Sequence, residues 1–235
     1  MKHIIIASTS TLHESNYLGY ILDELVSFFK DASTILFIPY ARPSGISHDD
    51  YTNKVQDAFL KINKHIVGIH TLKDPVKAIK NAEAIFVGGG NTFVLVNQLY
   101  KNKILTPLKE TVEKGIPYLG TSAGSNVCGL TMNTTNDMPI VQPPSFKTLG
   151  LVPFNINPHY LDPDPNSKHN GETRETRIKE FHAFNTQPVI GLREGSWLEV
   201  NGSTITLKGH LQARVFEHNK APYEIDPNTQ LDNLK

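Results

Sequence analysis

The sequence contains little cysteine, no excess of either charge and no long apolar segment. Its single cysteine, Cys128, excludes an intrachain disulfide. The 23 Lys and Arg side chains balance the 23 Asp and Glu side chains, so the formal net charge of zero offers no attraction for nucleic acid or an anionic membrane. No apolar run reaches the length of a membrane span, and the one after Met1 is too short for a signal peptide. We therefore expect a soluble, cytoplasmic protein with a small-molecule ligand.

Short apolar segments alternate with amphipathic segments through the first half of the chain. The apolar segments predict buried strands over 3–7, 34–39, 65–70, 84–87 and 116–119. Spacings of three and four residues between apolar side chains predict helices over 14–30, 49–62 and 74–81, after Asn91, and over 106–114. This βαβ alternation implies an α/β fold with a doubly wound, mostly parallel sheet, in which ligands bind beyond the carboxyl ends of the strands.

The second half of the chain is less regular. Its predicted elements are a loop or hairpin over 131–151, a mobile lid or rim over 162–172, a helix over 174–184 and a buried strand over 188–192. Residues 197–225 alternate apolar and polar side chains, and the Asn201-Gly202 turn within them predicts a C-terminal antiparallel hairpin. From Asp226 the tail is polar and is expected to be frayed. Since no linker divides the 235 residues, we expect one α/β domain over 1–235.

One pentapeptide has the spacing of a nucleophile elbow. Gly120, Ser122 and Gly124 form Gly-x-Ser-x-Gly between a predicted strand and a predicted helix. The two glycines allow a sharp turn that exposes the serine hydroxyl, and the start of the helix offers free N–H groups to developing negative charge. Because so short a motif also occurs by chance, its meaning depends on the other residues that the chain supplies.

A run of three glycines, 88–90, follows the strand predicted over 84–87. It lacks the spacing of a dinucleotide-binding loop and the Lys-Ser/Thr ending of a P-loop, which disfavours a phosphate site. A backbone N–H of this loop could instead face Ser122 and donate to an oxyanion. A plain turn that needs positive φ is the alternative for at least one of the glycines.

A serine nucleophile needs a base, usually a histidine that a carboxylate holds in place. Among the ten histidines, His159 lies between Pro158 and the apolar pair Tyr160-Leu161, which indicates a fixed, partly buried loop just past a strand. The carboxylate could belong to Asp137, Asp162 or Glu194. Position favours Glu194, because side chains at the carboxyl ends of strands face the site of such a fold.

Five blocks of the sequence, in this order, match a known family: 86–92 (Phe-Val-Gly-Gly-Gly-Asn-Thr), 120–126 (Gly-Thr-Ser-Ala-Gly-Ser-Asn), 134–139 (Thr-Thr-Asn-Asp-Met-Pro), 157–159 (Asn-Pro-His) and 193–195 (Arg-Glu-Gly). The chain resembles the peptidase E family of α-aspartyl dipeptidases. The resemblance implies a cytosolic serine peptidase with a fold similar to class I glutamine amidotransferases. It also implies hydrolysis of dipeptides that begin with aspartate, without a metal or another cofactor.

Carried over residue by residue, the resemblance implies a catalytic triad of Ser122, His159 and Glu194. It also implies that Gly90 and Ala123 supply the N–H groups of the oxyanion hole. The expected chemistry is attack by Ser122 on the peptide carbonyl, an aspartyl-enzyme intermediate and its hydrolysis by water.

Recognition of an N-terminal aspartate requires a cation for its side chain, and arginine binds a carboxylate best. The sequence has five arginines, of which Arg174, directly after the predicted rim, is the first candidate. Asp137 is a candidate for binding the substrate amino group, and Asn91 in the glycine loop is a further substrate-binding candidate. A surface ion pair is the alternative role for each charged residue.

Three other functions compete with this interpretation. An α/β-hydrolase-type esterase would use the same serine with its acid before its histidine, for instance Asp162 and His218. A cyanophycinase-like peptidase shares the elbow and differs in substrate, whereas an amidotransferase-like binding protein would keep the fold without turnover. For the chain we expect a small peptide substrate, no nucleic-acid or membrane partner, and a monomer or a homodimer.

Overall fold

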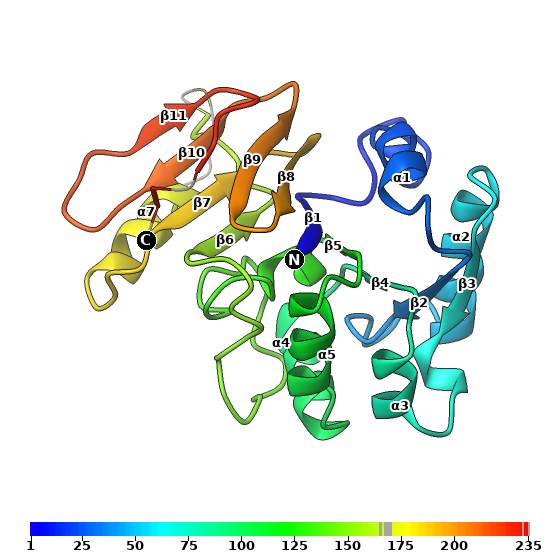
Figure 1. Ribbon diagram of the computed structural model, residues 1–235. Coiled ribbons are helices and arrows are strands. Elements are labelled where there is room, and N and C mark those ends of the chain that lie inside the picture. The colour runs from blue at the N-terminus through cyan, green and yellow to red at the C-terminus, as the bar shows by residue number, and fades with distance from the viewer. Residues whose placement is uncertain (165, 167–170, 232, 235) are drawn as a thin grey trace.

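The computed structural model describes residues 1–164, 166, 171–231 and 233–234. Within these residues the main sheet has seven strands in the order β3-β2-β4-β5-β1-β8-β9 (Figure 1). Its strands are β1 (His3–Ala7), β2 (Thr34–Ile38), β3 (His65–Gly68), β4 (Ala84–Val87), β5 (Tyr118–Thr121), β8 (Ser196–Asn201) and β9 (Thr204–Gly209). The first five run parallel, and β8 and β9 form an antiparallel hairpin at one edge. The predicted sheet and its C-terminal hairpin are confirmed.

Helices cover both faces of this sheet, as the alternation of side chains along each strand requires. On β1, Ile4 and Ile6 share one core with α3 (Pro75–Lys80), α4 (Thr92–Lys101) and α5 (Leu105–Glu113). Their neighbours Ile5 and Ala7 face the other core, with α1 (Leu22–Phe28) and α2 (His48–Leu60). Figure 1 shows α1 above the sheet and α4 and α5 below it. None of the described helices is both long and apolar enough to cross a membrane.

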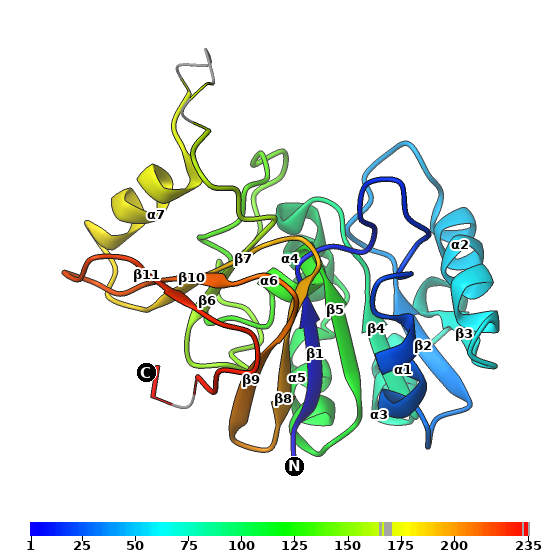
Figure 2. The same ribbon diagram turned by 90° about the horizontal axis from the view of Figure 1, so that it is seen from above.

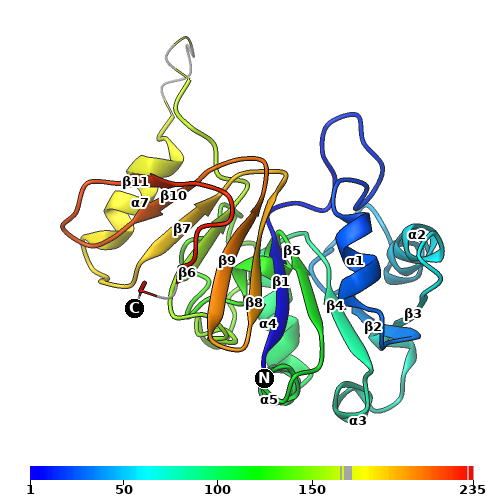
Figure 3. The same ribbon diagram turned by 45° about the horizontal axis from the view of Figure 1, so that its top comes forward.

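A second sheet lies beside the β8 and β9 edge of the main sheet (Figures 2 and 3). It has the strand order β11-β10-β7-β6, formed by β6 (Asn155–Pro158), β7 (Val189–Leu192), β10 (Ala213–Phe216) and β11 (Tyr223–Ile225). On it packs α7 (Arg174–His182), whose Ile178 and Phe181 contact Val189 and Phe216. The expectation of one antiparallel edge over 197–225 was therefore wrong beyond β9, because β10 pairs with β7 and not with the hairpin.

Two further expectations were wrong. The helix expected over 14–30 begins only at Leu22. Glu14 and Leu18 both adopt φ of 57°, a left-handed conformation that a helix cannot contain, and the Leu18 N–H donates to Ser10 O at 2.7 Å in a folded loop. The tail expected to fray after Asp226 instead returns to β9, where the buried Leu231 donates its N–H to the main chain. The side chains of Leu18 and Leu231 are buried in hydrophobic cores formed largely by residues far away in the sequence.

Candidate active site

Ser122 occupies a sharp turn between β5 and the short helix α6 (Ala123–Asn126). Its backbone has φ 54° and ψ −111°, a conformation that costs a non-glycine residue about 1–3 kcal/mol and is typical of functional sites. Side chains at the flanking glycines would overlap backbone: one at Gly120 would meet Gly124 O, and one at Gly124 would meet Val87 O. The Gly-x-Ser-x-Gly spacing is thus required by close backbone approach, and it leaves the serine side chain half-buried at the carboxyl end of the sheet.

The structure brings Ser122, His159 and Glu194 into one hydrogen-bonded series. His159 Nδ1 lies 2.5 Å from Glu194 Oε1, and His159 Nε2 lies 2.8 Å from Ser122 Oγ. Since a carboxylate only accepts, Nδ1–H of the neutral imidazole donates to Glu194, and Nε2 is left to accept the serine hydroxyl. His159 and Glu194 follow β6 and β7, which are adjacent parallel strands, so the sheet register places them side by side.

Ser8, at the end of β1, holds the histidine loop in place. His159 has φ of 54°, and its N–H donates to the buried Ser8 Oγ at 2.9 Å. The same hydroxyl donates to Leu192 O at 2.7 Å. One buried side chain therefore joins the end of β1 in the main sheet to the ends of β6 and β7 in the second sheet. Sequence reasoning missed Ser8. Its position directly after a buried parallel strand was the signal that could have identified it.

The glycine loop lies directly against the serine. Gly89 packs on the Ser122 side chain, and Gly90 has φ of 145°, with Ala41 O where a side chain would be. Among the described residues, neither the Gly90 N–H nor the Ala123 N–H has a hydrogen-bond acceptor. Two unpaired donors beside the serine could stabilise an oxyanion.

Tyr51 of α2 orients this loop from beneath. Its Oη accepts the Gly89 N–H at 3.1 Å and donates to Gly89 O at 3.3 Å. Gly89 C=O and Gly90 N–H belong to one planar peptide group, so the tyrosine sets the direction of the Gly90 donor. Sequence reasoning placed Tyr51 on an apolar helix face, and no local signal reveals where its hydroxyl points.

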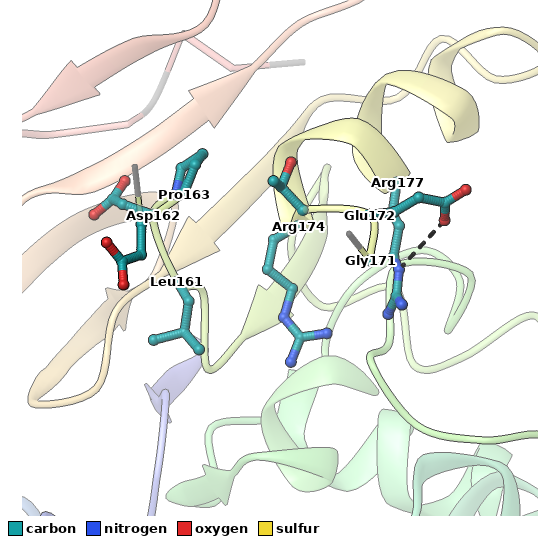
Figure 4. A pocket seen from close by; sticks show the side chains of 9 residues that line it. Leu161, Asp162, Pro163, Gly171, Glu172, Arg174 and Arg177 are labelled. Carbon is teal, nitrogen blue, oxygen red and sulfur yellow. Dashed lines mark ion pairs between the residues drawn. The ribbon is translucent and has the colours of Figure 1, made fainter. Parts of the chain in front are cut away.

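Arg174 begins α7 and faces a pocket of about 390 Å³ that Leu161, Asp162 and Arg177 also line. Figure 4 shows the side chains of Arg174 and Arg177 extending from α7, with Asp162 on the side of Arg174 that is opposite Arg177. Burial and the neighbouring Arg177 charge lower the pKa of Arg174, although a guanidinium remains protonated. Arg177 pairs with Glu172 at 3.8 Å, whereas Arg174 has no ion pair within the described residues.

Asp137 and Asn91 both contact the start of α4. Asp137 Oδ2 accepts hydrogen bonds from the Thr92 N–H, Thr92 Oγ1 and Thr135 Oγ1 at 2.6–2.9 Å. Its other oxygen receives none from the described residues. Asn91 caps the helix: Oδ1 accepts the Val94 N–H, and Nδ2 donates to Met138 O. The Asn91 side chain is thus occupied inside the protein, whereas one Asp137 oxygen can still accept from a ligand.

The alternative acid and base have other partners. Asp162 forms two hydrogen bonds with Arg193, at 2.7 and 2.9 Å, which lower its pKa. His218 Nδ1 lies 3.0 Å from His182 O. The esterase arrangement of Asp162 and His218 therefore has no support in the geometry. The lid or rim expected over 162–172 lies partly outside the described residues, and no group of three or more metal-ligand side chains occurs within them.

Comparisons with known proteins identify a family for the chain. The model of Peptidase family S51 matches residues 4–208. The chain is 46% identical to Peptidase E of Streptomyces coelicolor over 232 residues, covering 99% of this chain and 94% of that protein. It is also 46% identical over 236 residues to a Drosophila melanogaster protein named a probable alpha-aspartyl dipeptidase, covering 99% and 97%.

A crystal structure of a peptidase from an acI-B1 Actinobacterium has the same fold, with a TM-score of 0.73 at 16% identity over 98% of this chain and 96% of that one. The family resemblance inferred from five sequence blocks is confirmed. The strained serine, its histidine contact and the family match together lead to one conclusion: the chain belongs to peptidase family S51 and is a serine peptidase.

Proposed function

We propose that this protein is an α-aspartyl dipeptidase that acts through Ser122, His159 and Glu194. The observation that carries the proposal is the continuous hydrogen-bonded series from the Glu194 carboxylate to the serine hydroxyl. It lies next to two N–H groups that have no acceptor among the described residues. The Drosophila melanogaster relative is named for this same activity, which favours it over an esterase or a cyanophycinase-like activity.

Acylation would begin with the Ser122 Oγ–H. His159 Nε2 takes the hydroxyl proton as Oγ bonds to the carbonyl carbon of the aspartyl residue. Glu194 holds the Nδ1–H and stabilises the imidazolium, while the Gly90 and Ala123 N–H groups donate to the oxyanion. The C–N bond then breaks, and the imidazolium gives its proton to the leaving amine.

Deacylation repeats these steps with water as the nucleophile. His159 takes a proton from water as its oxygen attacks the aspartyl ester, and it returns that proton to Ser122 Oγ when the ester bond breaks. The products are free aspartate and the second amino acid. The chain, the dipeptide and one water molecule supply every atom and charge that these steps need.

Recognition of the aspartyl residue is assigned to Arg174 and Asp137. Arg174 forms no ion pair with a carboxylate among the described residues, so its guanidinium can form a bidentate contact with the substrate side chain. The free Asp137 oxygen can accept from the substrate ammonium group. Asp137 lies near enough to Arg174 for its charge to offset part of the lowering of the Arg174 pKa. Asn91 contributes by holding the loop and helix start on which these contacts depend.

The test is release of free aspartate from Asp-Leu by wild type and by Ser122→Ala, in the presence of a chelator. Leu-Leu, Glu-Leu and β-Asp-Leu serve as comparisons. We expect chelator-resistant cleavage of Asp-Leu alone, abolished in the variant, and loss of the preference for Asp-Leu in Arg174→Met. Cleavage of Leu-Leu at a similar rate, or none of Asp-Leu, would refute the proposed substrate class.

A further inference from the structure

A separate pocket of about 510 Å³ has His159 in its wall. It lies between the loop that follows β1, the loop that follows β2 and the first turns of α2. Its other walls include Thr9, Tyr17, Arg42, Ile46, Tyr51 and Lys54. None of these residues lines the pocket that contains Arg174, so His159 borders a second space that the aspartate-recognition site does not use.

Two cations in this wall lack an anionic partner in the part of the chain that the structure describes. Arg42 lies over the Tyr51 ring, 5.2 Å from the ring centre to Cζ, and Lys54 Nζ lies 5.4 Å from the centre of the Tyr17 ring. Within the described residues neither side chain forms an ion pair, and no Asp or Glu lines the pocket. Burial raises the pKa of Tyr17 well above its ordinary value, so that ring stays neutral. The pocket therefore presents uncompensated positive charge to a ligand.

The proposed reaction places one half of the substrate beside His159. His159 Nε2 must reach the leaving nitrogen to protonate it, so the second residue of the dipeptide starts beside His159. In that residue the α-carboxylate carbon is two bonds from the nitrogen, a separation of about 2.5 Å. A free carboxylate must therefore lie close to the histidine, in whichever neighbouring space offers positive charge.

The same pocket is joined to the oxyanion loop. Arg42 stacks on Tyr51, whose hydroxyl contacts Gly89, and the Asn91 N–H donates to Ala41 O at 2.7 Å, one residue before Arg42. The two cations are thus carried by segments that contact the glycine loop, and they line the same pocket as His159.

We propose that this pocket binds the second residue of the dipeptide and that Arg42 and Lys54 receive its free α-carboxylate. The inference rests on the proposed dipeptidase function and adds a reason for selecting dipeptides: a longer peptide has an uncharged amide where the carboxylate would be. The carboxylate is charged in substrate and transition state alike, so its recognition is expressed mainly in KM.

The test compares Asp-Leu with Asp-Leu-amide on wild type, Arg42→Gln, Lys54→Met and the control Lys61→Ala. Lys61 is exposed at the end of α2 and does not line the pocket. A charge-assisted hydrogen bond corresponds to about a 10–100-fold effect, so wild type should prefer Asp-Leu over the amide by about this factor in kcat/KM. Each pocket variant should lose much of that preference through a higher KM for Asp-Leu, Arg42→Lys should retain part of it, and Lys61→Ala should keep it.

Equal cleavage of acid and amide by wild type would overturn the inference and leave the proposed function intact. So would a variant that slows both substrates by the same factor, because this indicates a structural role for the side chain. Thermal unfolding of each variant identifies a misfolded protein, and the two single variants then provide independent tests. Failure of wild type to cleave either compound is a different result, which refutes the dipeptidase function itself.

Discussion

Tyr51→Phe removes one oxygen atom and should weaken catalysis by releasing the Gly89–Gly90 peptide group. The phenyl ring keeps its edge contact with Phe37, at 5.0 Å between ring centres, and the stack with Arg42. The change removes the pair of hydrogen bonds between Tyr51 Oη and Gly89, at 3.1 and 3.3 Å, and the longer contact of 3.5 Å with Tyr17 Oη. The Gly89–Gly90 peptide group can then rotate, and the proposed oxyanion donor at Gly90 loses its fixed direction.

The structure bounds the size of this effect. Complete loss of one oxyanion donor costs about 10²–10³ in kcat, which is the upper limit because the Gly90 N–H remains present. One hydrogen bond contributes about 0.5–1.5 kcal/mol net, or roughly 2–13-fold. We expect a fall in kcat of about 10-fold with little change in KM. The buried Gly89 N–H loses its partner, so the free energy of unfolding should fall by about 1–3 kcal/mol.

The assay is steady-state cleavage of Asp-Leu, together with the rate of fluorophosphonate labelling of Ser122 and urea unfolding. Tyr100→Phe is the matched control, because it also removes a tyrosine hydroxyl that donates to a backbone carbonyl, Lys147 O at 3.0 Å. This hydroxyl does not contact the oxyanion loop. A Tyr51→Phe variant that is destabilised yet retains wild-type kcat would refute the reasoning, since the hydroxyl would then support only the fold.

Three further predictions concern other parts of the molecule. Glu194→Gln should lower kcat by about 10²–10⁴ with the protein still folded, because an amide can stabilise neither the required tautomer nor the imidazolium; steady-state kinetics and circular dichroism check this, and near-normal kcat would contradict it. Cys128 should resist alkylation by iodoacetamide in native protein and react after denaturation, because burial raises its pKa to about 12; mass spectrometry reads the adduct, and rapid native labelling would contradict the burial. Arg193→Met should weaken the dependence of the free energy of unfolding on pH. Arg193 lowers the pKa of Asp162 and of Glu224, whose ordinary values are 3.8 and 4.5. The two ion pairs therefore stabilise the fold fully above these values, and the stabilisation is lost as the pH falls below them and the carboxylates are protonated. Urea unfolding at pH 7 and pH 3 should therefore show a smaller loss on acidification in Arg193→Met than in wild type, and equal losses would contradict the ion pairs.

Local sequence signals identified the elements whose conformation depends on neighbouring residues. The elbow is one example, because Gly120 and Gly124 flank Ser122 and the overlap that excludes side chains involves backbone of the same turn. The parallel strands are another, since continuous apolar runs indicate burial on both faces. The helix expected over 14–30 failed for the opposite reason: its apolar residues fitted a helical period, but Leu18 is buried in a loop against the end of β1.

The partners of His159 show the limit of such signals. From the residues alone, Asp137, Asp162 and Glu194 all remained available, and position on a predicted strand end only favoured Glu194. The structure pairs Glu194 with the histidine across 35 residues because β6 and β7 are adjacent in a second sheet. Nothing in the sequence pattern indicated that this sheet was separate from the first.

The sequence by itself determined the α/β alternation, the serine turn and the glycine loop, because each depends on residue types within a few positions of one another. Only the tertiary structure decided that Ser8 supports His159, that Tyr51 orients the Gly89–Gly90 peptide, and that Arg42 and Lys54 face the same pocket as the histidine. These contacts join residues far apart in the chain, and their formation depends on sheet register and loop packing. A polar residue at the end of a strand indicates that its side chain can form a hydrogen bond in the site. The fold of the whole chain determines which residue is its partner.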